Sequence, residues 1–433
     1  MQLVAIVAIV MCVTLIASIL LKPNVNIKGT NVGTYWIVAL AGALALLLTR
    51  SISLKEIGAG LVADTAINPL KILVLFLSMT VLSIFLDELG MFRYLANITL
   101  KKAKGSQKTL FFYLYVIVSI LTVFTSNDII ILTFTPFICY FSKNAKINPM
   151  PYLFTEFVAA NTWSMALIIG NPTNVYLATA NNINFIQYMS VMLLPTAMGG
   201  IVAMLVLYLI FRKTLEQPLE QSSDEFEIQD KGLLAIGVAH LAVCTVLLVI
   251  SSYVGLEMWL ITLCFALSLF LVSSIYCFFT KKSLGILWAT LKRAPWELIP
   301  FVIAMFVFVL AFDKCQLTDM IGHLLENEHV IFRYGIVSFL TANLVNNIPM
   351  SVLFSSVVQE LDPQVLMQGV YAAIVGSNVG AFFTPIGALA GIMWSGILKK
   401  HDVKMNFASY IKYGTAISVP TLLMTLLGLQ IVF

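Results

Sequence analysis

Four polar segments interrupt long apolar stretches of the chain, and their side chains are of the types that bind small solutes or ions. The segments are Ser126-Asn127-Asp128, Gly170-Asn171-Pro172-Thr173-Asn174, Asn346-Asn347-Ile348-Pro349 and Gly376-Ser377-Asn378-Val379-Gly380. Side-chain amides supply hydrogen-bond donors and acceptors without charge. We therefore expect a binding site for a solute or an ion, formed by Ser126, Asn127, Asp128, Asn171, Thr173, Asn174, Asn346, Asn347, Ser377, Asn378 and Thr384.

We call these four polar segments breaks. Asp128 is the acidic residue that lies within one of them. A carboxylate inside a membrane is costly, so one interpretation is that it binds a cation or carries a coupling proton. The other is that Ser126, Asn127 and Asp128 only cap the following helix, because these residue types are preferred N-caps. Glu156, early in its apolar run, is a second candidate for a proton relay, although we favour a solvated or snorkelling side chain there.

The remaining polar residues narrow the chemistry. No Lys or Arg lies in a break, which favours a neutral or cationic substrate, although helix N-termini can also bind a small anion. Scattered cysteines and histidines predict no metal site. Without a Gly-x-x-x-x-Gly-Lys loop or a paired nucleophile and base, we expect no enzyme and no cofactor, only a coupling ion, H⁺ or Na⁺.

The elements that must position these breaks are membrane spans. Apolar residues make up 60% of the 433-residue chain and charged residues 11%, against about 25% charged in a soluble domain, which excludes an ordinary soluble enzyme. A span needs about 20 mostly apolar residues. Such runs are 3–21, 34–49, 70–86, 110–142, 150–180, 188–212, 231–252, 256–279, 296–312, 331–360, 366–398 and 411–433.

The same order of elements occurs twice: three spans, a polar-tipped segment, an interrupted span and a last span. Short surface helices are expected at matching places, 88–103 and 314–328. If each polar-tipped segment is a re-entrant hairpin, every half crosses the membrane an odd number of times, five, and the second half is inverted, as in many secondary transporters. We thus expect an all-α polytopic membrane protein with two inverted-topology repeats, 1–212 and 231–433, joined by a cytoplasmic linker, 213–230.

Basic residues test this topology. Placing six loops on one side leaves only five of the 25 Lys and Arg residues on the other: Arg50, Lys55, Lys71, Lys314 and Arg333. By the positive-inside rule the richer side is cytoplasmic. We therefore expect a multi-pass protein of the cell membrane, the bacterial inner or plasma membrane, with both termini outside.

Several motifs occur in a recognisable order: Phe124-Thr125-Ser126-Asn127-Asp128 with Thr135-Pro136, Arg293-Ala294-Pro295-Trp296, Asn346-Asn347-Ile348-Pro349, and Thr384-Pro385-Ile386-Gly387 followed by Trp394. In these the chain resembles the arsenical pump membrane proteins, the arsenite and antimonite permeases of an ion-transporter superfamily that also holds NhaD-type sodium/proton antiporters. The resemblance implies a carrier that exports trivalent arsenic or antimony hydroxide by proton exchange, in some members with a soluble ATPase partner.

Three segments depart from the arsenite permeases. Their Ala-Asp-Thr is Ala160-Asn161-Thr162 here, and their Gly-x-Asp is Gly376-Ser377-Asn378. The segment 170–174 is closer to the Gly-x-Pro-x-Asn of other branches. Because two acids are replaced by neutral amides, Asp128 becomes the main candidate for proton coupling.

Three functions follow as hypotheses. The first is ion-coupled efflux of arsenite, antimonite or a similar small neutral oxyacid. The second is sodium/proton or other inorganic-ion antiport through Asp128. The third is sodium-coupled transport of an anion such as a dicarboxylate. The expected partners are a small inorganic solute or ion and the lipid bilayer, with a soluble ATPase subunit and a homodimer as further options, and no nucleic acid.

Overall fold

The computed structural model describes residues 2–22, 24–27, 30–63, 68–218, 228, 230–325 and 329–433. Apart from one antiparallel hairpin, β1 (Asn24–Ile27) with β2 (Thr30–Gly33), this part of the chain forms helices and their connections. The predicted all-α fold is therefore confirmed, with this hairpin as the exception. Most of the linker predicted at 213–230 lies outside the described residues, at 219–227 and 229.

The described helices fall into two successive sets. The first is α1 (Gln2–Leu21), α2 (Thr34–Leu48), α3 (Leu54–Val62), α4 (Pro69–Glu88), α5 (Met91–Lys102), α6 (Gln107–Phe124), α7 (Asn127–Asn144), α8 (Met150–Trp163), η1 (Ser164–Ala166), η2 (Ile168–Gly170), α9 (Pro172–Ala180) and α10 (Phe185–Leu215). The second is α11 (Lys231–Val254), α12 (Met258–Thr280), α13 (Gly285–Arg293), α14 (Leu298–Lys314), α15 (Leu317–Leu325), α16 (Val330–Val345), α17 (Asn347–Val357), η3 (Val358–Glu360), α18 (Leu366–Gly380), α19 (Leu389–Lys400) and α20 (Phe407–Val432).

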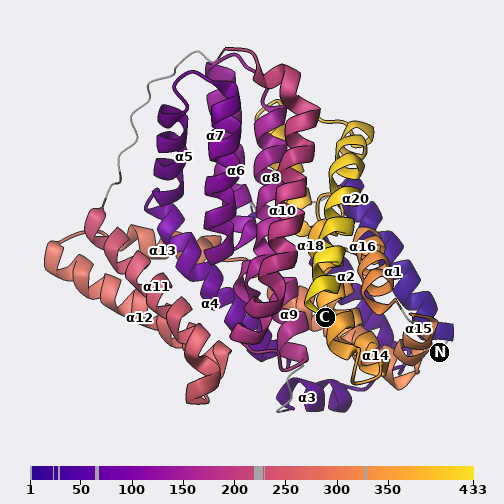
Figure 1. Cartoon of the computed structure of the whole chain (residues 1–433). Helices are drawn as coiled ribbons and strands as arrows, with labels where there is room; N and C mark the ends of the chain where they lie inside the picture. The colour runs from indigo at the N-terminus through magenta and orange to yellow at the C-terminus, as the bar shows by residue number, and fades with distance from the viewer. Residues whose placement is uncertain are drawn as a thin grey trace.

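Many of these helices are suited to a bilayer. Seven helical segments within the described residues are long and apolar enough to cross a membrane, and α1, α2 and α16 are shorter apolar helices. Leucine, isoleucine, valine and phenylalanine side chains remain exposed along α11 and α12, which stand at one edge of the molecule (Figure 1). Apolar helix faces that no protein covers are what a lipid environment requires, so the chain is a multi-pass membrane protein.

Helices of the first set pack against helices of the second set. α2 packs on α14, and α4 packs on α12. Nearer the centre, α9 contacts α17 and α7 contacts α19, while α10 and α20 run along each other (Figure 1). The two repeats, their boundaries and the inversion between them remain a proposal.

Local sequence signals explain where the helices at the centre begin. The Asn171 side chain caps α9 by accepting the Thr173 N–H at 3.2 Å, and Pro172 occupies the first helical position. Proline is favoured there because its missing N–H would have no partner in any case. The same combination of Asn68 and Pro69 starts α4.

Two of the predicted breaks lie elsewhere in the structure. The segment 376–380 was expected to be unwound, but it is the last part of α18, and the interruption is 381–388. The helix persists because it packs closely on α16, where an added Cβ at Gly376 would lie 2.5 Å from the Gly335 carbonyl oxygen. The interruption predicted at 170–174 also lies earlier in the chain and starts at Ser164. Thr173 and Asn174 belong to the first turn of α9.

Candidate functional site

The interruption between α8 and α9, residues 164–171, is closed by one of the predicted site residues, Asn174. Its Nδ2 donates to the carbonyl oxygens of Ser164, at 2.8 Å, and Leu167, at 3.3 Å. Gly170 packs against the same backbone, where an added Cβ would lie 2.3 Å from the Ser164 carbonyl oxygen. Unwound backbone at membrane depth must be satisfied by protein or by a water-filled cavity, and here a side-chain amide does so.

Asn378 joins this break to the second half. Its Oδ1 accepts from Asn171 Nδ2 at 2.8 Å and from the Ser164 hydroxyl at 3.0 Å. Its Nδ2 donates to Asn174 Oδ1 at 2.7 Å and to the Ile374 carbonyl. We call Ser164, Asn171, Asn174 and Asn378 the amide cluster; all four are buried. Because Asn378 uses both its donors and its acceptor, the cluster specifies a neutral amide in one orientation.

Asn161 extends the network to the first hairpin tip, where α6 meets α7. Asn127 Nδ2 donates to Asn161 Oδ1 at 3.0 Å, and Asn161 Nδ2 donates to the Phe157 carbonyl at 2.8 Å. The Ser164 hydroxyl lies 2.9 Å from the Asn161 carbonyl oxygen. The two asparagines that replace expected acids, Asn161 and Asn378, therefore belong to one continuous hydrogen-bonded network.

Asp128 lies in the first turn of α7, at the same tip. Its backbone N–H donates to Asn127 Oδ1 at 2.9 Å. Its carboxylate is partly exposed and has no hydrogen bond or ion pair among the described residues. The Ser126 side chain makes no capping bond either, so neither residue acts as the simple helix cap that the sequence allowed. The positive end of the α7 dipole stabilises a negative charge at this place.

The second hairpin tip, where α16 meets α17, is hydrogen-bonded to the interruption between α18 and α19, residues 381–388. Asn346 Nδ2 donates to the Ile386 carbonyl at 3.0 Å, and the Asn347 N–H donates to the Gly387 carbonyl at 2.9 Å. Asn346 has φ 79° and ψ 153°, a conformation that a residue with a side chain rarely adopts. Residues hold such strained backbone only where the surroundings over-determine it.

Two residues of this site were missed at the sequence level, Asn343 and Ser164. Asn343 Oδ1 accepts from the Thr384 hydroxyl at 2.6 Å and from its N–H at 3.2 Å, and Asn343 Nδ2 donates to the Gly380 carbonyl at 3.1 Å. The predicted residue Thr384 is thereby connected to the site. Asn343 is an amide inside the apolar run that leads to the Asn346-Asn347 break, and this signal could have found it. No comparable pattern marks Ser164.

Several buried polar atoms around this network have no hydrogen-bond partner within the protein. They belong to residues beside the bonded amides: Ser126 Oγ, Thr162 Oγ1, Thr173 Oγ1, Asn347 Oδ1 and Ser377 Oγ. Unsatisfied buried polar atoms are rare in folded proteins and call for an explanation such as a ligand. Four of these residues, Ser126, Thr173, Asn347 and Ser377, were predicted for the site, and Glu156 Oε1 is a further buried atom without a partner.

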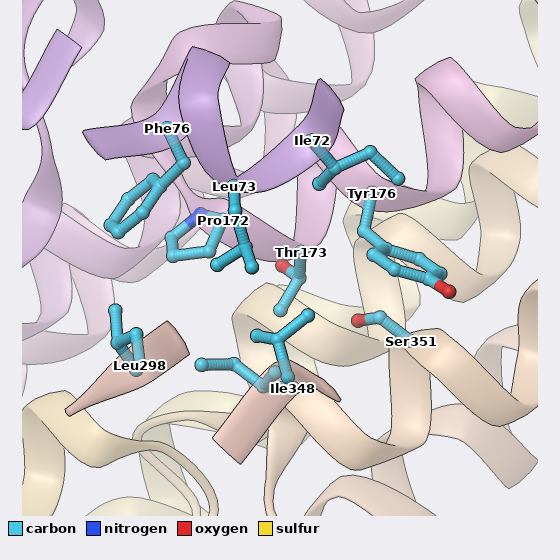
Figure 2. Close-up of a pocket in the computed structure, with 10 residues that line it drawn as sticks. Ile72, Leu73, Phe76, Pro172, Thr173, Tyr176, Leu298, Ile348 and Ser351 are labelled. Carbon is cyan, nitrogen blue, oxygen red and sulfur yellow. The ribbon is translucent and has the colours of Figure 1, made fainter. Parts of the chain in front are cut away.

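A small cavity borders the start of α9 (Figure 2). Its volume is about 20 Å³, enough for one water molecule, and its walls come from α4, α9, α14 and α17. Thr173 lines it, with Ile348 and Ser351 opposite. Thr173 therefore lines this mostly apolar cavity, while its backbone N–H donates to Asn171 of the amide cluster.

Glu156 corrects an expectation. A solvated or snorkelling side chain was favoured, but the residue is 0% exposed. It lies on α8, which packs against α6, α7 and α10, so protein surrounds the carboxyl group instead of solvent or lipid headgroups.

Among the described residues, no group of three or more His, Cys, Asp and Glu side chains could hold a metal ion.

Comparisons with known proteins identify relatives that are named as membrane pumps. The chain is 26% identical to a putative arsenical pump membrane protein of Bacillus subtilis (strain 168) over 430 residues, covering 92% of this chain and 94% of that protein. It is also 26% identical to the arsenical pump membrane protein of Escherichia coli (strain K12), covering 82% and 85% of the two chains.

A solved structure supports the fold alone. The YdaH transporter of Alcanivorax borkumensis, described as having an unusual topology, superposes with a TM-score of 0.54 at 13% identity, over 99% of this chain and 96% of that one. Residues 4–376 match the CitMHS family, described as citrate transporter. The chain therefore belongs to the CitMHS family and is a membrane transporter.

Proposed function

We propose that this transporter is an ion-coupled carrier that exports a small neutral oxyacid such as arsenite or antimonite. The observation that carries the proposal is the set of buried, uncharged polar atoms without a partner at the two hairpin tips and next to the bonded asparagines: Ser126 Oγ, Thr162 Oγ1, Thr173 Oγ1, Asn347 Oδ1 and Ser377 Oγ. Hydroxyl and amide groups match the donor and acceptor groups of an uncharged hydroxide. The arsenical pump names of the relatives support the same substrate class.

The absence of basic side chains fits a neutral solute. Strong anions are usually held by Arg or Lys, and neither is among the residues of the described network. In solution near neutral pH, trivalent arsenic hydroxide is uncharged, so its release from water costs less than that of an anion. Asp128, at the neighbouring hairpin tip, supplies the ionisable group for coupling to H⁺ or Na⁺.

Transport requires that packed helices separate. The cavity beside α9 has room for about one water molecule, too little for an oxyacid with three hydroxyl groups. Passage therefore needs the four helices that line this cavity, α4, α9, α14 and α17, to move apart. A rocking of one unit against the other would provide this opening, as in other carriers with a midplane site.

The test is arsenite transport in everted membrane vesicles or proteoliposomes under an imposed proton or sodium gradient. We expect gradient-driven arsenite accumulation with the parent chain and none with Asp128→Asn. The matched control is Asp362→Asn, the same chemical change in an exposed loop. An arsenite flux no greater than in empty vesicles, with the protein present and folded, contradicts the substrate.

Sodium/proton antiport is a second candidate, and the free carboxylate of Asp128 favours it. In the same vesicles, sodium added without arsenite would dissipate a proton gradient if the chain exchanged these ions. Dissipation that requires arsenite supports efflux of the oxyacid, whereas dissipation by sodium alone supports ion exchange.

A sodium-coupled carboxylate carrier is a third candidate, and the description of the family as citrate transporter favours it. Helix N-termini at α9 and α17 could bind a carboxylate without basic side chains. Sodium-stimulated uptake of labelled citrate or a dicarboxylate, in the absence of arsenite flux, would select this function. The orientation with both termini outside, an ATPase subunit and a homodimer remain proposals.

A further inference from the structure

Glu156 is a buried acid without a cationic partner, at a junction of helices from both halves. Its Oε2 accepts from the hydroxyl of Thr135 on α7 at 3.2 Å, and its Oε1 has no hydrogen-bond partner. The indole nitrogen of Trp394, on α19, lies beside the carboxyl group and is also without a hydrogen bond of good geometry. Two facing polar groups are thus left unsatisfied inside the protein.

Aromatic rings enclose this junction. The Trp394 ring centroid lies 5.0 Å from that of Phe157, 5.6 Å from that of Phe154 and 5.7 Å from that of Tyr410. Trp394 itself is fully buried. Packing of this kind excludes water from the carboxyl group.

The titratable groups near Glu156 offer no compensating charge. Cys139 of α7 is one turn beyond Thr135, and its thiol is close enough to interact electrostatically with the carboxyl group. The other titratable side chains buried on the surrounding helices are tyrosines: Tyr115 on α6, Tyr152 on α8, Tyr188 on α10, Tyr371 on α18 and Tyr410 on α20. Lys, Arg and His do not pair with Glu156 among the described residues. An isolated carboxylate is expensive in such surroundings, whereas the neutral acid can be accommodated.

We propose that Glu156 is a proton-binding site that couples protonation to the contact between α7 and α19. The inference rests on the proposed function, because it supplies the proton step of that transport. In the packed conformation Glu156 holds the proton. When α7 and α19 separate, water reaches the carboxyl group and the proton is released.

The position of the residue suits this coupling. α7 carries Thr135 in its middle and Asp128 at its start, so a movement of this helix reaches both acids. Pro136 removes one hydrogen bond from the α7 ladder next to Thr135, and the helix can bend there. In α18 the residue five positions before Asn378 is Ala373, whereas in α8 Glu156 is five positions before Asn161. The second half therefore offers no matching acid, and the proton site belongs to the first half alone.

The decisive measurement is infrared spectroscopy of the purified full chain, which detects the C=O band of a protonated carboxyl group. We expect a band at neutral pH that is missing from Glu156→Gln and retained in Asp362→Asn. Thr135→Val, which removes the hydroxyl donor, should keep the band but shift it toward that of a free acid. An identical band in the parent chain and in Glu156→Gln overturns the proposal. If Glu156→Gln fails to fold, an unshifted band in Thr135→Val overturns it.

Transport gives a second readout that separates this inference from the proposed function. In proteoliposomes, the acceleration of arsenite flux by a proton gradient should fall about tenfold in Glu156→Gln, within the range typical of coupled sites. Full coupling in that variant overturns the proton role while leaving arsenite transport standing. If the parent chain does not move arsenite, the transport proposal fails, and the infrared band still decides whether Glu156 holds a proton.

Discussion

At the first hairpin tip the backbone is relaxed and a side chain is free, whereas at the second the backbone is strained and tied down. Ser126 has an ordinary extended conformation, φ −93° and ψ 140°, and Asp128 beside it has no partner among the described residues. Asn346 has φ 79°, and hydrogen bonds to the Ile386 and Gly387 carbonyls hold Asn346 and Asn347 to the segment between α18 and α19. The two tips occupy matching places in the order of helices but are stabilised differently.

This difference suggests a division of labour. The first half contains both buried or semi-buried acids near the site, Asp128 and Glu156, while the second tip has apolar Ile348 where the first has Asp128. Asn378 of α18 nevertheless closes the break of the first half. We infer that ion binding belongs to the first half, and that the second half mainly provides a rigid partner for it.

The largest expected effect comes from exchanging the free acid. Asp128→Asn should reduce gradient-driven transport to background, because the coupling ion loses its charged ligand. Asn347→Ala, at the second tip, removes an unpaired amide oxygen and should raise KM about fivefold, the effect of one hydrogen bond of about 1 kcal/mol, with coupling preserved. Initial rates at several gradients separate the two. If Asn347→Ala abolished coupling as completely as Asp128→Asn, the division between the tips would be wrong.

The two asparagines of the network provide the next comparison. In Asn378→Asp, the oxygen that replaces Nδ2 would face Asn174 Oδ1, at 2.7 Å, and the Ile374 carbonyl, at 2.8 Å. A buried uncompensated charge of this kind costs about 3–5 kcal/mol. Asn161→Asp faces one such carbonyl, that of Phe157, and should lose less stability.

Acid should rescue the more severe variant, Asn378→Asp. Once protonated, the introduced carboxyl group could donate to Asn174 as the amide does. The melting temperature of this variant should therefore fall as pH rises and approach that of the parent chain at low pH. Melting of the detergent-purified chains across a pH series measures this. A pH-independent loss would mean that shape, and not charge, selects the amide.

Sequence patterns located most of these residues but not their partners. The breaks were recognisable because Asn, Gly and Pro interrupt apolar runs, and Asn171, Asn174 and Asn378 do form one cluster. Their pairing connects residues more than 200 positions apart, and helical periodicity carries no information on such contacts. The extent of α18 was mispredicted for the same reason: Gly376 packs against Ser338 and the Gly335 carbonyl of α16, and this tertiary packing keeps a Gly-rich segment helical.

Glu156 shows a different limit of sequence reasoning. Its place early in an apolar run predicted contact with solvent, but α7 and α19 cover it through Thr135 and Trp394. The position of a residue along its own helix does not indicate which neighbouring helices cover it. The order of the helices, by contrast, follows directly from the sequence because most helices carry their own apolar run.

Ion pairs at the C-terminal ends of α4 and α14 provide a third comparison, with a smaller expected effect on stability. Arg293 donates to Asp87 at 2.7 Å and to Glu88 at 2.6 Å, and Thr133 of α7 donates to the same Asp87 at 2.7 Å. Because Asp87 is buried, Arg293→Ala leaves a carboxylate without its cation, bonded only by the Thr133 hydroxyl, and should cost about 1–3 kcal/mol.

The corresponding pair at α14 is exposed. Lys314 lies 2.8 Å from Glu56, and bonds from Lys314 and Ser53 lower the pKa of Glu56 to about 2. Its contribution is present above the ordinary pKa of Glu, about 4.3, is lost as pH falls toward 2, and is screened by salt. Lys314→Ala should therefore leave the melting temperature at neutral pH and high salt unchanged, and an effect as large as that of Arg293→Ala would contradict the assignment.

The smallest effect tests the strain at the second tip, through glycine and alanine at equivalent places. Asn346→Ala loses the bonds to Ile386 and Ile348 and keeps an unfavourable φ, whereas Asn346→Gly loses the same bonds but relieves the backbone. The glycine variant should be more stable by about 1 kcal/mol. At Ser126, where φ is ordinary, the order should reverse, because glycine loses more conformational freedom on folding. Melting temperatures of the four variants measure the reversal, and the same order at both sites would show that the two tips do not differ in backbone strain.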